Sequence, residues 1–328
     1  MPAPAGGKTD EQTRRTVNTI GIHHVTAISG EAQRNVDFYV GVLGLRMVKK
    51  TVNFDDPGTY HLYYGDGEGS PGSIMTFFPW ANAPKGTQGS GQLTVTSFSV
   101  PEGSLDFWTD HLSESGASPG ELEDRFGDTV LPFADPDGIK LELVANRDGG
   151  SPWKDGAVPT ENAVRGFRAV TLSVANPERT ARLMTETLGF RKTSEGEKRS
   201  RYEAGEGGPG NSVDIVGGEE AGRMGVGTVH HVAFRVPDEE AQEGLRKEIA
   251  ALGFDVTPVL DRNYFRSIYF REPGGVLFEI ATDPPGFTAD EAPEKLGTSL
   301  KLPPWLESRR ERIEEVLPPL NVPTEESA

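Results

Sequence analysis

The chain has 328 residues, of which 35% are hydrophobic and 25% charged, a composition typical of a globular protein with roughly two domains. It contains no cysteine, which excludes disulfides, thiolate metal sites and cysteine nucleophiles and leaves His, Asp and Glu as the strong metal ligands. The net charge of -17 argues against nucleic acid as a partner, because binding phosphates needs an excess of Lys and Arg.

The N-terminal segment, residues 1–19, is polar and has no apolar run of the kind found in signal peptides. We predict a disordered lead here and, without an export signal, a cytoplasmic protein. No stretch of the sequence approaches the roughly 20 apolar residues that a membrane span requires, so we expect no membrane partner.

Four stretches that follow repeat one pattern: a short alternating strand, a helix of about a dozen residues, and three more strands, the last after a glycine turn. The copies cover residues 20–80, 90–147, 164–217 and 226–283. Their first strands align as "HHVTAIS", "TVTSFSV", "RAVTLSV" and "HHVAFRV". The pattern predicts an α+β fold built from four βαβββ modules.

One βαβββ module leaves one face of its sheet open, so two modules must pair into a cupped, barrel-like sheet. We expect the first module to pair with the fourth and the second with the third. Residues 20–147 would form the first half and residues 164–283 the second, joined by a Gly- and Pro-rich linker, residues 148–163. Residues 284–328 are predicted to be a Pro-rich C-terminal arm with one short helix around Trp305–Val316.

Four of the six histidines form two doublets, His23-His24 and His230-His231, each at the start of a predicted strand. Side chains alternate across a strand, so without a bulge only one member of each doublet faces the cupped side. His230 has the parity of Val232 and of the other apolar residues expected to lie under the helix. This parity places His231, and by alignment His24, on the concave face as candidate metal ligands.

The matching concave position of the four last strands is occupied by Thr76, Glu142, Asp214 and Glu279. If the first module pairs with the fourth, their sheet collects His24, His231 and Glu279, while Thr76 adds no strong ligand. Two histidines and one carboxylate with open positions form the facial triad of non-haem Fe(II) oxygenases, and Mn(II) suits the same ligands. A closed set of four ligands would instead favour Zn or Ni chemistry such as isomerisation.

Each of these residues also has a purely structural interpretation. A histidine on a strand is more often a hydrogen-bonded core residue than a ligand, and a buried acid such as Glu142 or Asp214 is more often paired with an arginine. His23 and His230 can be packed histidines or groups that touch a substrate. Aligned doublets together with Glu279, which apolar residues flank, favour the metal site, because an unpaired carboxylate there would be costly.

The module is similar to that of the vicinal oxygen chelate superfamily, which includes glyoxalase I, bleomycin-resistance proteins and extradiol dioxygenases. More narrowly, the chain resembles ring-cleaving dioxygenases that open hydroquinones. This resemblance is clearest in "GIHHVTAISGEAQRNVDFYVGVLGLRMVKK", "VHHVAFRVPD" and "DRNYFRSIYFREPGGVLFE", and it covers residues 20 to 300.

The resemblance implies an Fe(II)-dependent dioxygenase of aromatic degradation that inserts both atoms of O₂ into a dihydroxybenzene, with His24, His231 and Glu279 as metal ligands. It also implies that other side chains bind the substrate, move protons or hold anionic oxygen, namely His23, Thr26, His230, Arg262 and Tyr269. His61 and Phe77 match the same branch, and both can equally be residues that pack the sheet.

Catechol-cleaving members take their histidines from adjacent modules of the C-terminal half, whereas the third module here has Ala169 at that position. This departure favours a hydroquinone-type substrate, with a catechol-type substrate left open. One alternative is a lyase of the glyoxalase I type, which would require a second carboxylate where Thr76 lies. The other is a small-molecule sequestering protein, which would have no reason to keep the triad. A homo-oligomer is also left open.

Overall fold

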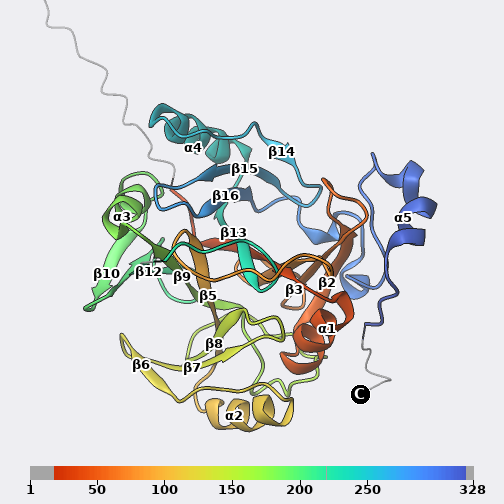
Figure 1. The fold of residues 1–328 in the computed structure, drawn as a ribbon, viewed down its shortest axis with the longest axis horizontal. Coiled ribbons are helices and arrows are strands. Elements are labelled where there is room, and N and C mark those ends of the chain that lie inside the picture. The colour runs from red at the N-terminus through yellow and green to blue at the C-terminus, as the bar shows by residue number, and fades with distance from the viewer. Residues whose placement is uncertain (1–17, 219, 323–328) are drawn as a thin grey trace, which may run out of the picture.

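The computed structural model describes residues 18–218 and 220–322, and these form four consecutive βαβββ units, as Figure 1 shows. Apart from residues 18 and 19, the predicted N-terminal lead lies outside the described residues. Within the described part of the chain, no helix combines the length and the apolar character needed to cross a membrane.

The order of elements confirms the predicted α+β repeat. The first unit contains β1 (Ile22–Ser29), α1 (Ala32–Val36), the π-helical segment η1 (Asp37–Val42), β2 (Arg46–Val52), β3 (Tyr60–Gly65) and β4 (Ile74–Pro79). The second contains β5 (Gln92–Pro101), α2 (Leu105–Glu114), β6 (Glu123–Arg125), β7 (Asp128–Ala134) and β8 (Lys140–Asn146). The third contains β9 (Phe167–Val174), α3 (Pro177–Glu186), β10 (Arg191–Glu195), β11 (Arg199–Glu203) and β12 (Ser212–Gly217). The fourth contains β13 (Thr228–Val236), α4 (Glu239–Ala251), β14 (Leu260–Asp261), β15 (Arg266–Arg271) and β16 (Leu277–Thr282).

The helix α4 illustrates why the helices form where they do. The Asp238 carboxylate accepts a hydrogen bond of 2.8 Å from the backbone N–H of Ala241, which caps a donor that the helix itself leaves unpaired. Leu245 and Ile249 follow at a spacing of four residues, which places them on one face of the helix, and both are fully buried. The capped, amphipathic helix therefore covers the convex face of its sheet.

Two eight-stranded sheets result, with the strand orders β14-β15-β16-β13-β1-β4-β3-β2 and β10-β11-β12-β9-β5-β8-β7-β6. The antiparallel pair β1–β13 places the first and fourth modules in one sheet, and β5–β9 places the second and third in the other. Within a module the first strand runs parallel to the last, as in β13 and β16. The two ends of the repeat region thus build one sheet and its middle builds the other (Figure 1).

The pairing of β1 with β13 contains two register shifts, and each leaves one histidine as an extra residue. The first shift lies between the pairs Ile22–Phe234 and His24–Ala233 and leaves His23 without a partner in the register. The second lies between the pairs Thr26–His231 and Ala27–Val229 and leaves His230 without one. His23 and His230 are therefore bulge residues. A β-bulge bends the strand and turns the extra side chain away from strict alternation.

The acids on the concave face of the second sheet are held by arginines. Arg125 donates hydrogen bonds of 2.7 and 2.8 Å to the two carboxylate oxygens of Glu142. Asp214 accepts from Arg201 Nε at 2.8 Å and from Arg199 at 3.0 Å. These pairs satisfy both buried carboxylates, which confirms the structural interpretation of these two acids.

The C-terminal arm packs against the first sheet beside β2 (Figure 1). It contains the short segments η2 (Phe287–Ala289), η3 (Pro293–Lys295) and η4 (Glu307–Arg309) and the predicted helix, α5 (Arg310–Val316). A fully buried lysine of β2, Lys49, anchors it: the Nζ lies 2.6 Å from Asp290 Oδ1 and 2.5 Å from Glu291 Oε2. The arm is therefore tied to the first sheet by buried charges.

Candidate metal centre

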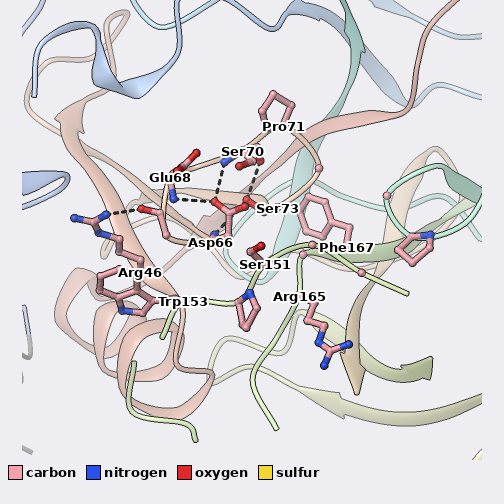
Figure 2. A pocket seen from close by; sticks show the side chains of 18 of the residues that line it. Arg46, Asp66, Glu68, Ser70, Pro71, Ser73, Ser151, Trp153, Arg165 and Phe167 are labelled. Atoms are coloured by element: carbon pink, nitrogen blue, oxygen red, sulfur yellow. Dashed lines mark hydrogen bonds between the residues drawn. The ribbon is translucent and has the colours of Figure 1, made fainter. Parts of the chain in front are cut away.

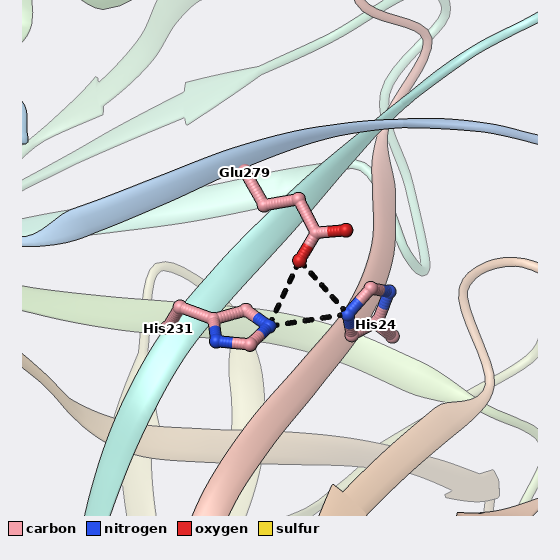
Figure 3. Close-up of side chains that lie close together, drawn as sticks. All are labelled: His24, His231 and Glu279. Carbon is pink, nitrogen blue, oxygen red and sulfur yellow. Dashed lines mark hydrogen bonds and ion pairs between the residues drawn. The ribbon is translucent and has the colours of Figure 1, made fainter. Parts of the chain in front are cut away.

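Three side chains from distant parts of the chain converge on the concave face of the first sheet (Figure 3). His24 on β1 and His231 on β13 lie 207 residues apart in the sequence, yet their Nε2 atoms are 3.3 Å apart. Glu279 on β16 places Oε2 2.9 Å from His231 Nε2 and 3.3 Å from His24 Nε2. The structure thus brings together all three residues that we predicted as metal ligands.

The geometry of this cluster fits a divalent cation better than it fits a closed hydrogen-bond network. Glu279 is fully buried, and although its Oε2 lies close to both imidazole Nε2 atoms, neither contact has the geometry of a hydrogen bond. A buried carboxylate oxygen left in this way is costly. A cation bound by this oxygen and by the two imidazole nitrogens would remove that cost, and such a donor set suits Fe(II) or Mn(II).

The protonation states also suit metal binding at neutral pH. Burial lowers the pKa of His231, so its imidazole is neutral and has a free lone pair. Burial by itself would raise the pKa of Glu279, but the imidazoles of His24 and His231 outweigh it and hold that pKa well below its usual range. The cluster therefore offers an ionised carboxylate beside the neutral imidazole of His231.

The two bulged histidines orient the two candidate ligands. His23 Nδ1 lies 2.9 Å from His24 Nδ1, and His230 Nδ1 lies 2.8 Å from His231 Nδ1. Each contact engages the Nδ1 of a ligand histidine and so directs its Nε2 toward Glu279. Burial lowers the pKa of His230 to about 3, so this residue is neutral at pH 7. Groups that fix ligand orientation in this way commonly tune metal affinity.

Ser267 on β15 fixes the carboxylate, because its hydroxyl donates a short hydrogen bond to Glu279 Oε1. Replacing Ser267 by Ala is expected to weaken metal affinity about 10- to 100-fold, the usual effect of losing such a support. Metal titration of the folded variant measures this. The matched control is Ser97→Ala, since Ser97 donates to Glu142 in the second sheet; equal weakening in both variants would contradict the assignment.

A cavity of about 500 Å³ opens onto the cluster. Its lining includes five of the predicted site residues, His24, His230, His231, Arg262 and Tyr269. The expectation that His230 lies on the apolar face under the helix was wrong, because the bulge rotates it to the same cavity as His231. His23 and Thr26 are not among the lining residues and are almost completely buried.

Arg262 and Tyr269 form a joined pair on the wall of this cavity. The Nε of Arg262 donates to the Tyr269 hydroxyl at 3.3 Å, and its guanidinium lies 5.3 Å from the centre of the tyrosine ring. Burial raises the pKa of Tyr269, so the phenol keeps its proton at neutral pH. The Tyr269 ring lies 5.7 Å from the ring of His231. A fixed positive charge and a phenol therefore lie beside the cluster.

Several aromatic lining residues were not predicted from the sequence, notably Phe78, Trp80 and Phe265. Phe265 packs against His24 with ring centres 5.0 Å apart. His61 lines the cavity, whereas Phe77 is buried in the core against Tyr39. The available signal was the run of aromatic residues near "TFFPW" and "NYFRS", but aromatic residues in strands usually pack the core.

A larger cavity of about 970 Å³ lies outside this cluster, where the linker meets the loop after β3 (Figure 2). Its charged groups have both signs, and some of them are engaged with neighbours. The guanidinium of Arg46 stacks at 4.5 Å on Trp153, and Asp66 accepts hydrogen bonds from the backbone of Glu68 and Ser70. The candidate metal ligands do not line it, so we place the functional site in the smaller cavity.

Fold and site together define a protein of four βαβββ modules in two sheets, with one candidate centre of two histidines and one carboxylate in the first sheet. The family model described as the Glyoxalase/Bleomycin resistance protein/Dioxygenase superfamily matches residues 21–143 and 166–280. The chain belongs to this superfamily, which confirms the resemblance seen in the sequence.

Similar proteins cover nearly the whole chain. The "Putative ring-cleaving dioxygenase MhqO" of Bacillus subtilis (strain 168) is 48% identical over 309 residues, which are 93% of this chain and 97% of that protein. The "Chlorohydroquinone/hydroquinone 1,2-dioxygenase" of Sphingobium indicum is 38% identical over 303 residues, 89% and 94% of the two chains.

Solved structures show the same fold. One from Bacillus subtilis subsp. subtilis str. 168 has a TM-score of 0.91 and 47% identity, and the match covers 94% of this chain and 99% of that chain. Glyoxalase I from Zea mays has a TM-score of 0.60 at 17% identity, with 80% and 92% covered, and this likeness shows the fold alone.

Proposed function

We propose that this protein is an Fe(II)-dependent ring-cleaving dioxygenase that opens dihydroxybenzenes of the hydroquinone type with O₂. The observation that carries the proposal is the convergence of His24, His231 and Glu279 in one cluster, whose two histidines line an aromatic-lined cavity. Relatives that are 38% and 48% identical and carry names of ring-cleaving dioxygenases support it. Mn(II) suits the same three ligands and is the second metal to test.

With Fe(II) bound by these side chains, the open coordination positions would take substrate and O₂ and allow electrons to pass between them. The remaining chemistry is supplied by residues on the cavity wall. The Arg262 guanidinium offers a fixed positive charge to phenolate or other anionic oxygen. Tyr269, which keeps its proton, can donate a hydrogen bond to such an oxygen.

His230 is the candidate to donate a hydrogen bond to a substrate oxygen. With His231 Nε2 left free for a metal, the Nδ1–H of His231 donates to His230 Nδ1, so the single proton of the neutral His230 lies on Nε2. The apolar and aromatic wall, which includes Phe78, Trp80 and Phe265, can pack against a flat ring and limit the access of water.

A lyase of the glyoxalase I type is less well supported. It needs another carboxylate at the metal, and the corresponding position is Thr76 on β4. The Thr76 hydroxyl lies 2.9 Å from the Thr26 hydroxyl and 2.8 Å from His61 Nε2, so neighbouring polar groups already engage it. A threonine in such a network does not replace a charged metal ligand.

The test is oxygen uptake by protein loaded anaerobically with Fe(II), and separately with Mn(II), after addition of hydroquinone or catechol. We expect equimolar consumption of O₂ and hydroquinone and formation of a ring-opened acid. Absence of uptake with every dihydroxybenzene would overturn the proposal. In that case, turnover of a hemithioacetal would indicate a lyase, and tight binding without turnover would indicate sequestration.

A further inference from the structure

Two polar residues of the first module lie on the cavity wall and have no role in the function described above. His61 and Tyr63 are both on β3 and both line the 500 Å³ cavity. The Tyr63 hydroxyl lies 2.8 Å from His61 Nδ1, and His61 Nε2 lies 2.8 Å from the Thr76 hydroxyl. The two side chains are therefore held together as one fixed pair.

An aromatic surface connects this pair with the histidine doublet. The Phe78 ring lies 4.4 Å from the ring of His61 and 5.9 Å from the ring of His230, measured between ring centres. Phe265, which packs on His24, lines the same cavity. A flat ligand that lies along Phe78 would therefore contact both the His61–Tyr63 pair and His230, the neighbour of the candidate ligand His231.

The pair can accept a hydrogen bond from such a ligand. Burial raises the pKa of Tyr63 and lowers that of His61, so both are neutral at pH 7. With His61 Nε2–H donating to Thr76, Nδ1 accepts the single proton of the Tyr63 hydroxyl. The Tyr63 oxygen then keeps a lone pair with no other assigned hydrogen bond, and this lone pair can accept an O–H from a ligand.

We propose that the His61–Tyr63 pair receives the substrate hydroxyl remote from the metal centre and so makes the site select 1,4-dihydroxybenzenes over 1,2-dihydroxybenzenes. The inference rests on the proposed function, because it assumes that one phenolic oxygen occupies the metal centre. A 1,2-dihydroxybenzene has both hydroxyls on one edge of the ring and presents a C–H group to the pair. A buried polar group left without its partner is what rejects such an analogue.

The experiment compares the binding of hydroquinone and phenol to the metal-loaded protein without O₂. Phenol has one hydroxyl and lacks the remote one. We expect the Kd ratio of phenol to hydroquinone to fall about tenfold in Tyr63→Phe, which is the usual effect of one hydrogen bond. The ratio of kcat/KM for hydroquinone over catechol is expected to fall in the same variant.

The matched control is Tyr64→Phe on the same strand. The Tyr64 hydroxyl donates to Asn35 Oδ1 at 2.9 Å and does not line the cavity, so this variant should keep both wild-type ratios. His61→Phe should behave like Tyr63→Phe, and His61→Gln, which keeps a polar group, should recover part of the Kd ratio. An unchanged Kd ratio in Tyr63→Phe, or equal weakening of both ligands, would overturn the inference.

Failure of the proposed function is a separate outcome. If the wild-type protein turns over no dihydroxybenzene but Tyr63→Phe still lowers the Kd ratio of phenol to hydroquinone, ring cleavage is overturned and the binding role of the pair is kept. If the wild-type protein cleaves hydroquinone but Tyr63→Phe leaves the Kd ratio unchanged, the proposed function is kept and the role of the pair is rejected.

Discussion

Replacing Glu279 by Gln is expected to remove metal binding at the candidate centre and to lower turnover of a dihydroxybenzene by at least about 10³-fold. The substitution keeps the size of the side chain but removes the only carboxylate of the three-residue cluster found among the described residues. A bound metal stabilises a transition state by several kcal/mol, and each 1.36 kcal/mol corresponds to about a tenfold change in rate.

Metal content after dialysis and oxygen uptake measure the two effects. The matched control is Glu142→Gln, because Glu142 occupies the same position in the second sheet: it pairs with Ser97 across β8 and β5 as Glu279 pairs with Ala233 across β16 and β13. This control should bind the metal and turn over substrate as the wild type does. Stoichiometric metal in Glu279→Gln would show that the centre has been placed wrongly.

Replacing Lys49 by Met is expected to lower the free energy of unfolding by about 3–5 kcal/mol, the cost of breaking a buried ion pair by removing one partner. The Lys49 side chain is fully buried, and its Nζ also contacts the backbone oxygen of Phe287 at 3.1 Å. Without it, the carboxylates of Asp290 and Glu291 lose the cation that they share, and that of Glu291 is almost fully buried. Denaturant unfolding measures the loss.

Two controls distinguish the effect of losing the buried ion pair from the effect of replacing a lysine by methionine. Lys247→Met removes an exposed lysine on α4, whose Nζ lies 3.5 Å from Glu243, and should cost less than about 1 kcal/mol. Adding Asp290→Asn and Glu291→Gln to Lys49→Met should restore part of the lost stability, because no unpaired charge then remains. A small effect of Lys49→Met alone would mean that the arm contributes little to the folded state.

Local patterns in the sequence were sufficient for most of the fold. Alternating strands, helices of about a dozen residues and glycine turns recur four times in the sequence, and each feature depends on neighbouring residues alone. The same alternation identified His24, His231 and Glu279, because strand parity determines which side chains share a face. To predict that these three side chains lie close together, we also had to assume that the first module pairs with the fourth.

Other parts of the site could not be predicted in this way. The position of His230 depends on a bulge, and a bulge exists only relative to a partner strand, here one about two hundred residues away in the chain. The contact of His61 and Tyr63 with the cavity depends on how far the sheet curls. The contact of Lys49 with the C-terminal arm depends on where the arm packs.

By itself, the amino-acid sequence determined the four modules, the two-sheet class and the three candidate ligands, because these follow from periodicities of two and of about 3.6 residues along the chain. Only the tertiary structure decided which histidines share a cavity, which aromatic residues line it and what anchors the arm. These features depend on contacts between residues far apart in the sequence, and no local periodicity encodes such contacts.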